Sequence, residues 1–120
     1  MNSNDIVIIS ATRTAIGKFG GQFSSISAVE LGTAAAKSAI QKGNIDPTLI
    51  DTVIYGQVLQ AGLSQNPARQ VALNSGLSHT STALTVNEVC GSGLKSILLA
   101  AQAIRLGDAK IVLAGGMENM

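Results

Sequence analysis

The sequence predicts an α/β protein with a parallel sheet, and three observations support this. Short apolar runs rich in Val and Ile alternate with longer segments that have helical spacing. The links between them are short and often contain glycine, of which the 120 residues hold 13. The run Ile6–Ile9 is β-branched throughout, which is typical of a strand buried on both faces. The order βαβαβαβ with short links favours parallel strands joined by right-handed crossovers.

The first part of the chain is expected to form a strand, a helix and a second strand. Ile6–Ile9 is the first expected strand. Ser27 and Glu30 have the spacing of a capping box, which predicts a helix beginning after Ser27. Gly43 follows the last apolar position of that helix and is expected to end it as a left-handed glycine. The second strand is expected at about Thr52–Leu59.

A second helix and a third strand are expected next. Asn66 followed by Pro67 pairs an N-cap residue with a proline at the first helical position. The helix is therefore expected over Ala68–Ser75, ending at Gly76. Thr82–Val86 is a short β-type run and is expected to form the third strand.

The third helix is expected over Gly91–Leu106, with Gly107 ending it and a fourth strand at Lys110–Ala114. Beyond its first turn, the only polar side chains of this helix are Lys95, Ser96, Gln102 and Arg105. A helix that is apolar on nearly all sides is buried on several sides, whereas one sheet covers only one. We therefore expect a second half of the protein, or a partner chain, to cover it.

Composition excludes several classes of function. The net charge is +1 and no basic run is present, which argues against a nucleic-acid partner. One cysteine forms no internal disulfide, which favours a reducing compartment, and we expect a cytoplasmic protein. The first residues lack a basic region followed by a long apolar run, so neither a secretory signal nor a membrane partner is expected.

The single cysteine, Cys90, lies between the third expected strand and the third expected helix. At a helix N-terminus, unpaired N–H groups and the helix dipole favour thiolate over thiol. A thiolate is the nucleophilic form of cysteine, so Cys90 is a candidate catalytic nucleophile. Glu88 is two residues earlier, and its negative charge would oppose this effect if it faced the thiol.

Several segments in register resemble the thiolase family, and in particular the acetyl-CoA acetyltransferases. The strongest match is Asn87–Gly93, which resembles the segment around the family's nucleophile. Further matches are spread along the whole chain: residues 13–17, 56–62, 65–69 and 114–120. One local departure is Glu88, at a position where the family often has a basic or amide residue. The resemblance covers all 120 residues as a partial N-terminal thiolase domain, with a parallel sheet of strand order 3-2-1-4.

The resemblance implies reversible condensation of two acetyl-CoA molecules to acetoacetyl-CoA and CoA, as used in fatty acid and ketone metabolism. Cys90 would carry the acyl group, and its backbone N–H would stabilise the oxyanion. Asn87, Gly91 and Gly93 would support it, the glycines by leaving room for the substrate. Neither a cofactor nor a metal is expected; coenzyme A thioesters are the substrates.

The resemblance also implies what the chain does not supply. The family's catalytic histidine, second cysteine and water-holding asparagine belong to its C-terminal half, which has no counterpart among these residues. The nucleophile alone is therefore expected here. The implied partners are the C-terminal half of the same enzyme and further copies in a homo-dimer or homo-tetramer.

Three other interpretations remain open. The first is a fragment of a condensing enzyme of the ketoacyl-synthase type. The second is a non-catalytic α/β module that docks a partner through its third helix. The third is a domain that binds a phosphate-containing ligand at Gly91–Gly93, although this segment lacks the P-loop and GxGxxG patterns.

Other candidate residues have simpler interpretations. His79 lies in a polar loop, where a solvated side chain is more common than a catalytic base. Arg13 and Arg69 are interpreted as anchors of loops or interfaces rather than as ligands of CoA phosphates. Met117 and Met120 are expected to serve in packing rather than in a catalytic pocket.

Overall fold

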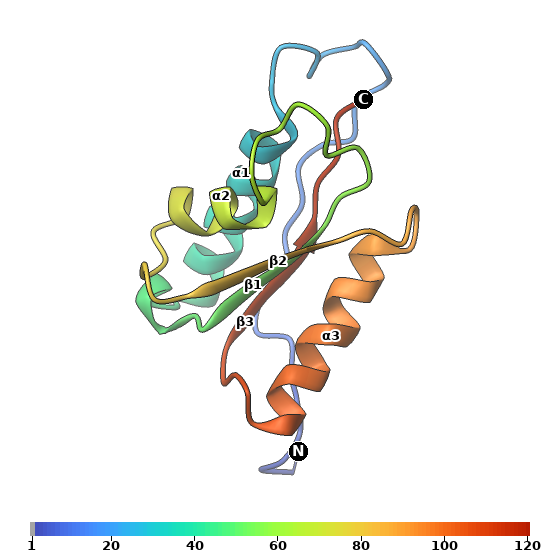
Figure 1. The fold of residues 1–120 in the computed structure, drawn as a ribbon. Helices are drawn as coiled ribbons and strands as arrows, with labels where there is room; N and C mark the ends of the chain where they lie inside the picture. The colour runs from blue at the N-terminus through green and yellow to red at the C-terminus, as the bar shows by residue number, and fades with distance from the viewer. Residues whose placement is uncertain (1) are drawn as a thin grey trace.

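A computed structural model describes residues 2–120 as three layers, with helices on both faces of a parallel sheet. Figure 1 shows α1 (Ala28–Gly43) and α2 (Pro67–Asn74) on one face and α3 (Ser92–Leu106) on the other. The strands are β1 (Thr52–Gly56), β2 (Thr82–Val86) and β3 (Val112–Gly116), and a short 3₁₀ turn, η1 (Pro47–Leu49), precedes β1. The predicted α/β class with a parallel sheet is confirmed.

The sheet has three strands in the order β2-β1-β3, not four in the order 3-2-1-4. β1 pairs directly with β3 along its whole length, from Thr52 opposite Val112 to Gly56 opposite Gly116. This pairing closes the place between them that the prediction gave to Ile6–Ile9. The other three predicted strands are present, and their relative order is the predicted one once the first is left out.

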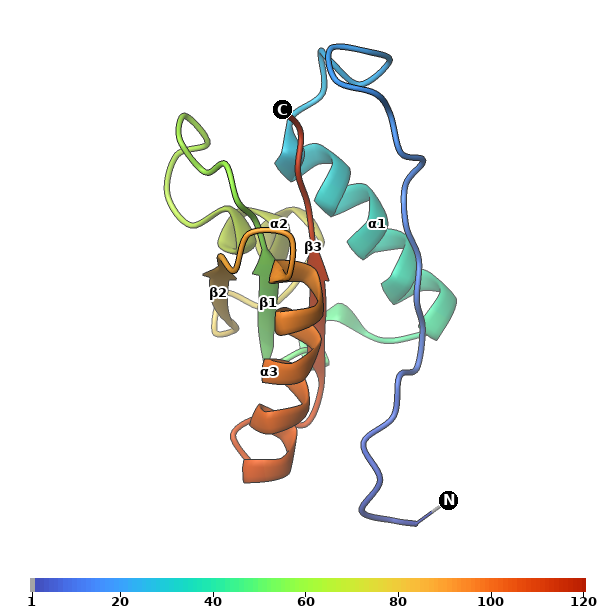
Figure 2. The same cartoon turned by 90° about the vertical axis from the view of Figure 1, so that its right-hand side faces the viewer.

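The predicted strand at Ile6–Ile9 does not form. The segment is extended and exposed, and Figure 2 shows it running beside α1, outside the sheet. A groove of about 980 Å³ is lined by this segment, β3 and α3. The segment is tied instead to α1, where the hydroxyl of Thr12 donates to the carbonyl of Ala35 at 2.7 Å. The β-branched run therefore has strand composition without a neighbour to pair with.

The ends of the helices follow local signals in the sequence. The predicted capping box of α1 is confirmed, because the Ser27 hydroxyl accepts from the Glu30 N–H and the Glu30 carboxylate accepts from the Ser27 N–H. The left-handed residue at its C-terminus is Asn44 (φ 51°), not Gly43. Asn tolerates this conformation through its short polar side chain. At α2, the predicted pair of Asn66 as N-cap and Pro67 at the first turn is confirmed.

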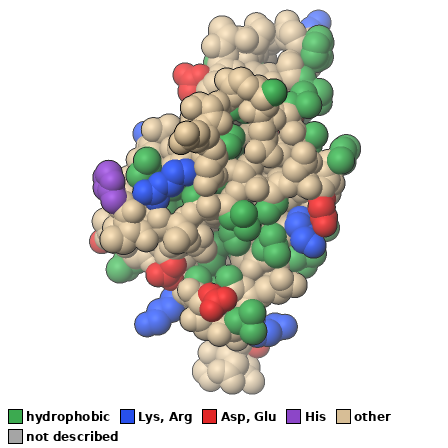
Figure 3. Space-filling view, in the orientation of Figure 1, with side chains coloured by type: hydrophobic (Ala, Val, Ile, Leu, Met, Phe, Trp, Pro, Cys, Tyr) green, Lys and Arg blue, Asp and Glu red, His purple; other side chains and the backbone are tan. Residues whose placement is uncertain are grey.

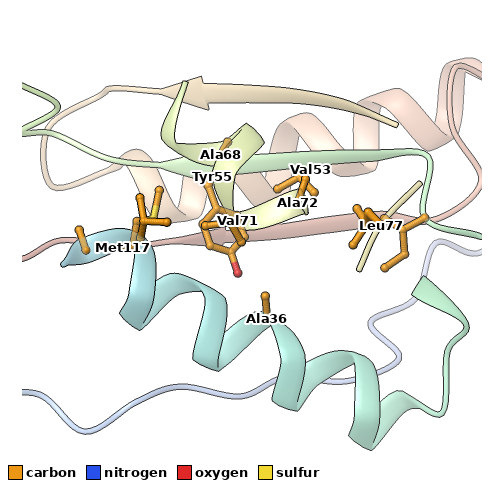
Figure 4. Close-up of a cluster of buried hydrophobic side chains, with 11 residues drawn as sticks. Ala36, Val53, Tyr55, Ala68, Val71, Ala72, Leu77 and Met117 are labelled. Carbon is orange, nitrogen blue, oxygen red and sulfur yellow. The ribbon is translucent and has the colours of Figure 1, made fainter. Parts of the chain in front are cut away.

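The main core lies between the sheet and the two helices α1 and α2. Figure 4 shows Val53 and Tyr55 of β1 pointing toward Val71 and Ala72 of α2 and toward α1. Val53, Val71 and Ala72 are fully buried. These small and medium side chains allow the layers to approach closely, and the core needs no large aromatic cluster.

α3 packs on the opposite face of the sheet and is covered on one side only. Its buried side carries Ser96, whose hydroxyl donates to the carbonyl of Gly115 at 2.8 Å. Its other side exposes Leu94 and Leu98, at 65% and 52%. Figure 3 shows hydrophobic side chains gathered over α3 in this view. The chain itself therefore leaves uncovered the apolar surface for which a covering was predicted.

By length and composition alone, the stretch Val89–Leu106 resembles a membrane span, with a mean hydropathy of 1.2. One helix of this kind is weak evidence for a membrane, because the core helices of soluble proteins share the property. α3 makes specific contacts with the sheet, and the expected absence of a membrane partner stays a prediction.

Candidate functional site

Cys90 lies in an exposed turn of five residues, 87–91, that joins the end of β2 to the start of α3. α3 begins at Ser92, one residue later than predicted, and Gly91 is its N-cap without a side-chain cap. The thiol is therefore at the N-terminus of a 15-residue helix, as predicted. The dipole of such a helix favours negative charge at this end.

The residue before the cysteine has a strained backbone. Val89 has φ 53°, in the left-handed region that β-branched residues rarely adopt. Its side chain is 62% exposed, so burial does not compensate for this conformation. Such strain persists only where neighbouring contacts hold it. The residue type does not indicate this conformation, because valine is a normal residue for the end of a strand.

Ser92, the first residue of α3, holds the turn in place through hydrogen bonds. Its hydroxyl accepts from the Glu88 N–H at 2.8 Å and donates to the Val89 carbonyl at 2.6 Å. The Ser92 N–H donates to the same carbonyl at 3.1 Å, and the Gly91 N–H donates to the Glu88 carbonyl at 3.1 Å. Ser92 is only 4% exposed. One buried hydroxyl thus fixes both residues that precede Cys90.

None of the hydrogen bonds described for residues 2–120 uses the N–H of Cys90. The amides on both sides of it, those of Val89 and Gly91, each donate within the turn. The turn therefore presents one thiol and one unused N–H from the same residue. This is the pairing that acyl transfer requires, with a nucleophile beside a donor for the oxyanion.

β1 ends against the start of α3, and Gly56 makes this close approach possible. A Cβ atom at Gly56 would lie 2.6 Å from the carbonyl carbon of Ser92 and 2.7 Å from its oxygen. Real Cβ atoms essentially never come this close, so any side chain at this position would force α3 to shift. The end of the central strand therefore sets the position of the helix that follows Cys90.

Asn87 links the turn to the segment after β1. Its Oδ1 accepts from the Val89 N–H at 2.8 Å, and its Nδ2 donates to the Val58 carbonyl at 3.3 Å. The Val58 N–H in turn donates to the Glu118 carboxylate at 2.9 Å. The structure thus brings predicted Asn87 into the turn, whereas Glu118 was not predicted as a site residue. No local motif identifies Glu118, because its partners are about 60 residues away in sequence.

The two glycines predicted to make room for a substrate are Gly91, the N-cap of α3, and Gly93, in its first turn. A Cβ at Gly93 would meet nothing within 4 Å, and one at Gly91 would be 3.4 Å from the Glu88 carbonyl oxygen. Space is therefore present beside both. Their role toward a substrate stays a prediction, as does that of Asn87.

Glu88 is paired with a positive charge. Its Oε1 lies 3.2 Å from Nζ of Lys95, one helical turn into α3. Both side chains are partly exposed, so the pair contributes little to stability. It nevertheless provides a counter-charge for the carboxylate that was expected to oppose formation of the thiolate.

His79 lies far from Cys90. It precedes the start of β2 at Thr82, whereas Cys90 follows the end of that strand. A five-residue strand spans roughly 16 Å. The His79 carbonyl accepts from the Arg69 guanidinium at 3.0 Å, and that guanidinium also donates to the Ser81 carbonyl. Arg69 is thus a loop anchor, and His79 is no base for this thiol within the chain.

The remaining candidates do not join the turn. Met117 is 8% exposed and belongs to the core cluster, in agreement with the packing interpretation. Met120 is 69% exposed, and Arg13 donates to the neighbouring Thr14 carbonyl. In residues 2–120, no group of three His, Cys, Asp or Glu side chains is placed to hold a metal ion. The groove beside the N-terminal segment is not lined by Cys90.

Comparison with known proteins identifies the family. The family model described as thiolase, N-terminal domain, matches residues 6–120. The chain belongs to the thiolase family. A relative from Escherichia coli (strain K12), named acetyl-CoA acetyltransferase, is 60% identical over 95% of this thiolase chain and 29% of its own length. A relative of the same name from Cupriavidus necator is 55% identical over 97% of the chain and 30% of its own length.

The solved structures agree with this family. A thiolase from Ascaris suum in complex with coenzyme A matches with a TM-score of 0.89 and 43% identity. The match covers 91% of this chain and 28% of that one. This thiolase chain thus spans about three tenths of the length of the curated relatives that it matches. The resemblance inferred from Asn87–Gly93 is confirmed, and with it the thiolase-like fold.

Proposed function

We propose that residues 1–120 are part of the N-terminal domain of an acetyl-CoA acetyltransferase and supply its nucleophile. The reaction is the reversible condensation of two acetyl-CoA molecules to acetoacetyl-CoA and CoA. The observation that carries the proposal is the turn at Cys90, in which an exposed thiol and an unused N–H of the same residue lie at a helix N-terminus. The names of the relatives, acetyl-CoA acetyltransferases, supply the substrate class.

In the first step, the Cys90 thiolate attacks the carbonyl carbon of acetyl-CoA, forming a carbon–sulfur bond. The negative charge moves to the carbonyl oxygen, where the Cys90 N–H donates a hydrogen bond. The bond to the CoA sulfur then breaks, and CoA leaves as a thiolate that takes up a proton. One thioester is exchanged for another, so the free energy changes little and the step is reversible.

The second step requires proton transfer to and from another acetyl-CoA, and the histidine of this chain is not placed for it. His79 is the only histidine in the sequence and lies at the opposite end of β2. We infer that another part of the enzyme provides these groups and covers Leu94 and Leu98 of α3. Assembly as a homo-dimer or homo-tetramer, a cytoplasmic location and independence of any cofactor belong to the same proposal.

The test is acylation of the chain by acetyl-CoA, followed by intact mass spectrometry. A single acetyl adduct is expected on the wild-type chain and none on Cys90→Ser, which is isosteric and removes the only thiol. Gln102→Ala, at an exposed position in the last turns of α3, is a control that should still be acylated. Absence of the adduct, both here and in a longer protein containing this segment, would contradict the proposal.

A second measurement separates acylation from turnover. The purified 120-residue chain is expected to form the adduct but to release no acetoacetyl-CoA over many equivalents of substrate. Steady production of acetoacetyl-CoA by this chain alone would show that the nucleophile is not its only contribution.

A further inference from the structure

Glu118 lies in the segment that follows β3 and binds two successive backbone amides. Its Oε2 accepts from the Val58 N–H at 2.9 Å and its Oε1 from the Leu59 N–H at 3.3 Å. The side chain is half-buried. Hydrogen bonds to a charged acceptor are stronger than those between neutral groups. The carboxylate therefore holds the segment after β1 against the segment after β3.

The same peptide segment contacts the nucleophile's turn. The Val58 carbonyl accepts from Nδ2 of Asn87, and Oδ1 of Asn87 accepts from the Val89 N–H. With both of its ends engaged, the Asn87 amide can take only one orientation. A continuous path of hydrogen bonds thus runs from Glu118 through Val58 and Asn87 to the residue next to Cys90.

This path ends at Val89, the residue with the strained backbone. Val89 has φ 53° and an exposed side chain, so its conformation is held by hydrogen bonds rather than by burial. The Val89–Cys90 peptide carries the N–H of Cys90. A shift of Val89 toward a relaxed conformation would therefore rotate that N–H away from its present direction.

We propose that Glu118 is a positioning residue for Cys90, acting through Val58 and Asn87 on the Val89–Cys90 peptide. The contacts alone support the positioning, and its effect on acyl transfer rests on the proposed function. A carboxylate suits this place because it offers two acceptor oxygens to two adjacent donors. In Glu118→Gln, the amide nitrogen would face one of those N–H groups, and in Glu118→Asp the shorter side chain would not reach both.

The first measurement is amide hydrogen exchange at Val89, followed by NMR under native conditions. Glu118→Gln is expected to speed this exchange by about tenfold, the effect of losing roughly one hydrogen bond to a charged group. Val89 does not touch Glu118, so simple loss of a direct contact cannot produce the change. Glu30→Gln is the matched control, because that carboxylate also accepts a backbone N–H, but in the capping box of α1. Equal acceleration in the control, or none in Glu118→Gln, would overturn the proposal.

The second measurement compares two reactions of Cys90. Glu118→Gln is expected to slow acylation by acetyl-CoA about tenfold, whereas alkylation by iodoacetamide, which needs no oxyanion donor, should change less than twofold. If Glu118→Gln slows both reactions equally, or slows neither, the proposed positioning role of Glu118 is contradicted. If Cys90 is alkylated but neither the wild-type chain nor a longer protein containing it is acylated, the proposed function fails, and exchange at Val89 still decides the role of Glu118.

A double-mutant cycle adds an independent check. Asn87→Ala cuts the same path, so combining it with Glu118→Gln should add little to the exchange rate of Val89. Additive effects would show that the two residues act separately. Should Glu118→Gln fail to fold by circular dichroism, Glu118→Asp keeps the charge and replaces it in the cycle.

Discussion

The contact between Gly56 and Ser92 predicts that one added methyl group on β1 will displace the helix that carries Cys90. In Gly56→Ala, the new Cβ would start 2.6 Å from the Ser92 carbonyl carbon. Ordinary carbon contacts begin at about 3.5 Å, so α3 must move by roughly 0.9 Å. Overpacking of this kind costs about 1–3 kcal/mol, of which the lower backbone entropy of unfolded alanine recovers about 0.5–1 kcal/mol. We expect a net loss of about 1–2 kcal/mol.

Gly93→Ala is the matched comparison, because it adds the same methyl group at the residue after Ser92. A Cβ there meets nothing within 4 Å, and alanine is the better helix former by up to about 1 kcal/mol. Urea denaturation of both variants should therefore give midpoints on opposite sides of the wild type, with unchanged slopes. If Gly56→Ala is as stable as the wild type, the close approach of β1 to α3 is not a constraint and the reasoning fails.

Three further predictions concern single groups. Ser96→Ala leaves the Gly115 carbonyl without its buried donor and should lower the free energy of unfolding by about 1–2 kcal/mol, measured with urea. Burial raises the pKa of Tyr55 to about 12, so the stability that this side chain contributes should be lost as the pH rises from about 10 to about 12. Because Tyr55 is the only tyrosine, tyrosinate absorbance should report the change, and a midpoint near 10 in the folded chain would contradict it. The backbone N–H groups of Ile111 and Lys110, just before β3, lower the pKa of Asp51 below its usual value of 3.8. Stability should therefore fall as the pH drops through that range, and less steeply in Asp51→Asn.

Local signals in the sequence predicted most of the elements, because each signal acts within one turn of chain. Ser27 and Glu30 form their capping box from side chains three residues apart, and Asn66 caps α2 in the same way. The strand predicted at Ile6–Ile9 was wrong because composition shows only that the run would suit a strand. Whether it becomes one depends on a neighbour, and β3 pairs with β1 instead.

The same distinction applies to the site. Cys90 and Asn87 were identifiable as candidates because the motif that resembles the thiolase family is contiguous. Glu118, which holds the segment after β1, and Gly56, which admits α3, act between segments distant in sequence. Only the folded chain brings them together. The left-handed conformation of Val89 was also hidden, because nothing in the residue type indicates it.

The unpaired run Ile6–Ile9 has a consequence for handling this chain in isolation. It is extended and β-branched, carries no charge, and exposes 53–74% of its three residues from Val7 to Ile9. β3 lies at a sheet edge and has an unpaired side. Extended apolar segments and open edges are templates for pairing between chains, which leads to aggregation. This N-terminal run should therefore limit the solubility of the chain at high concentration. Ile8→Lys should raise the solubility without altering the Cys90 turn.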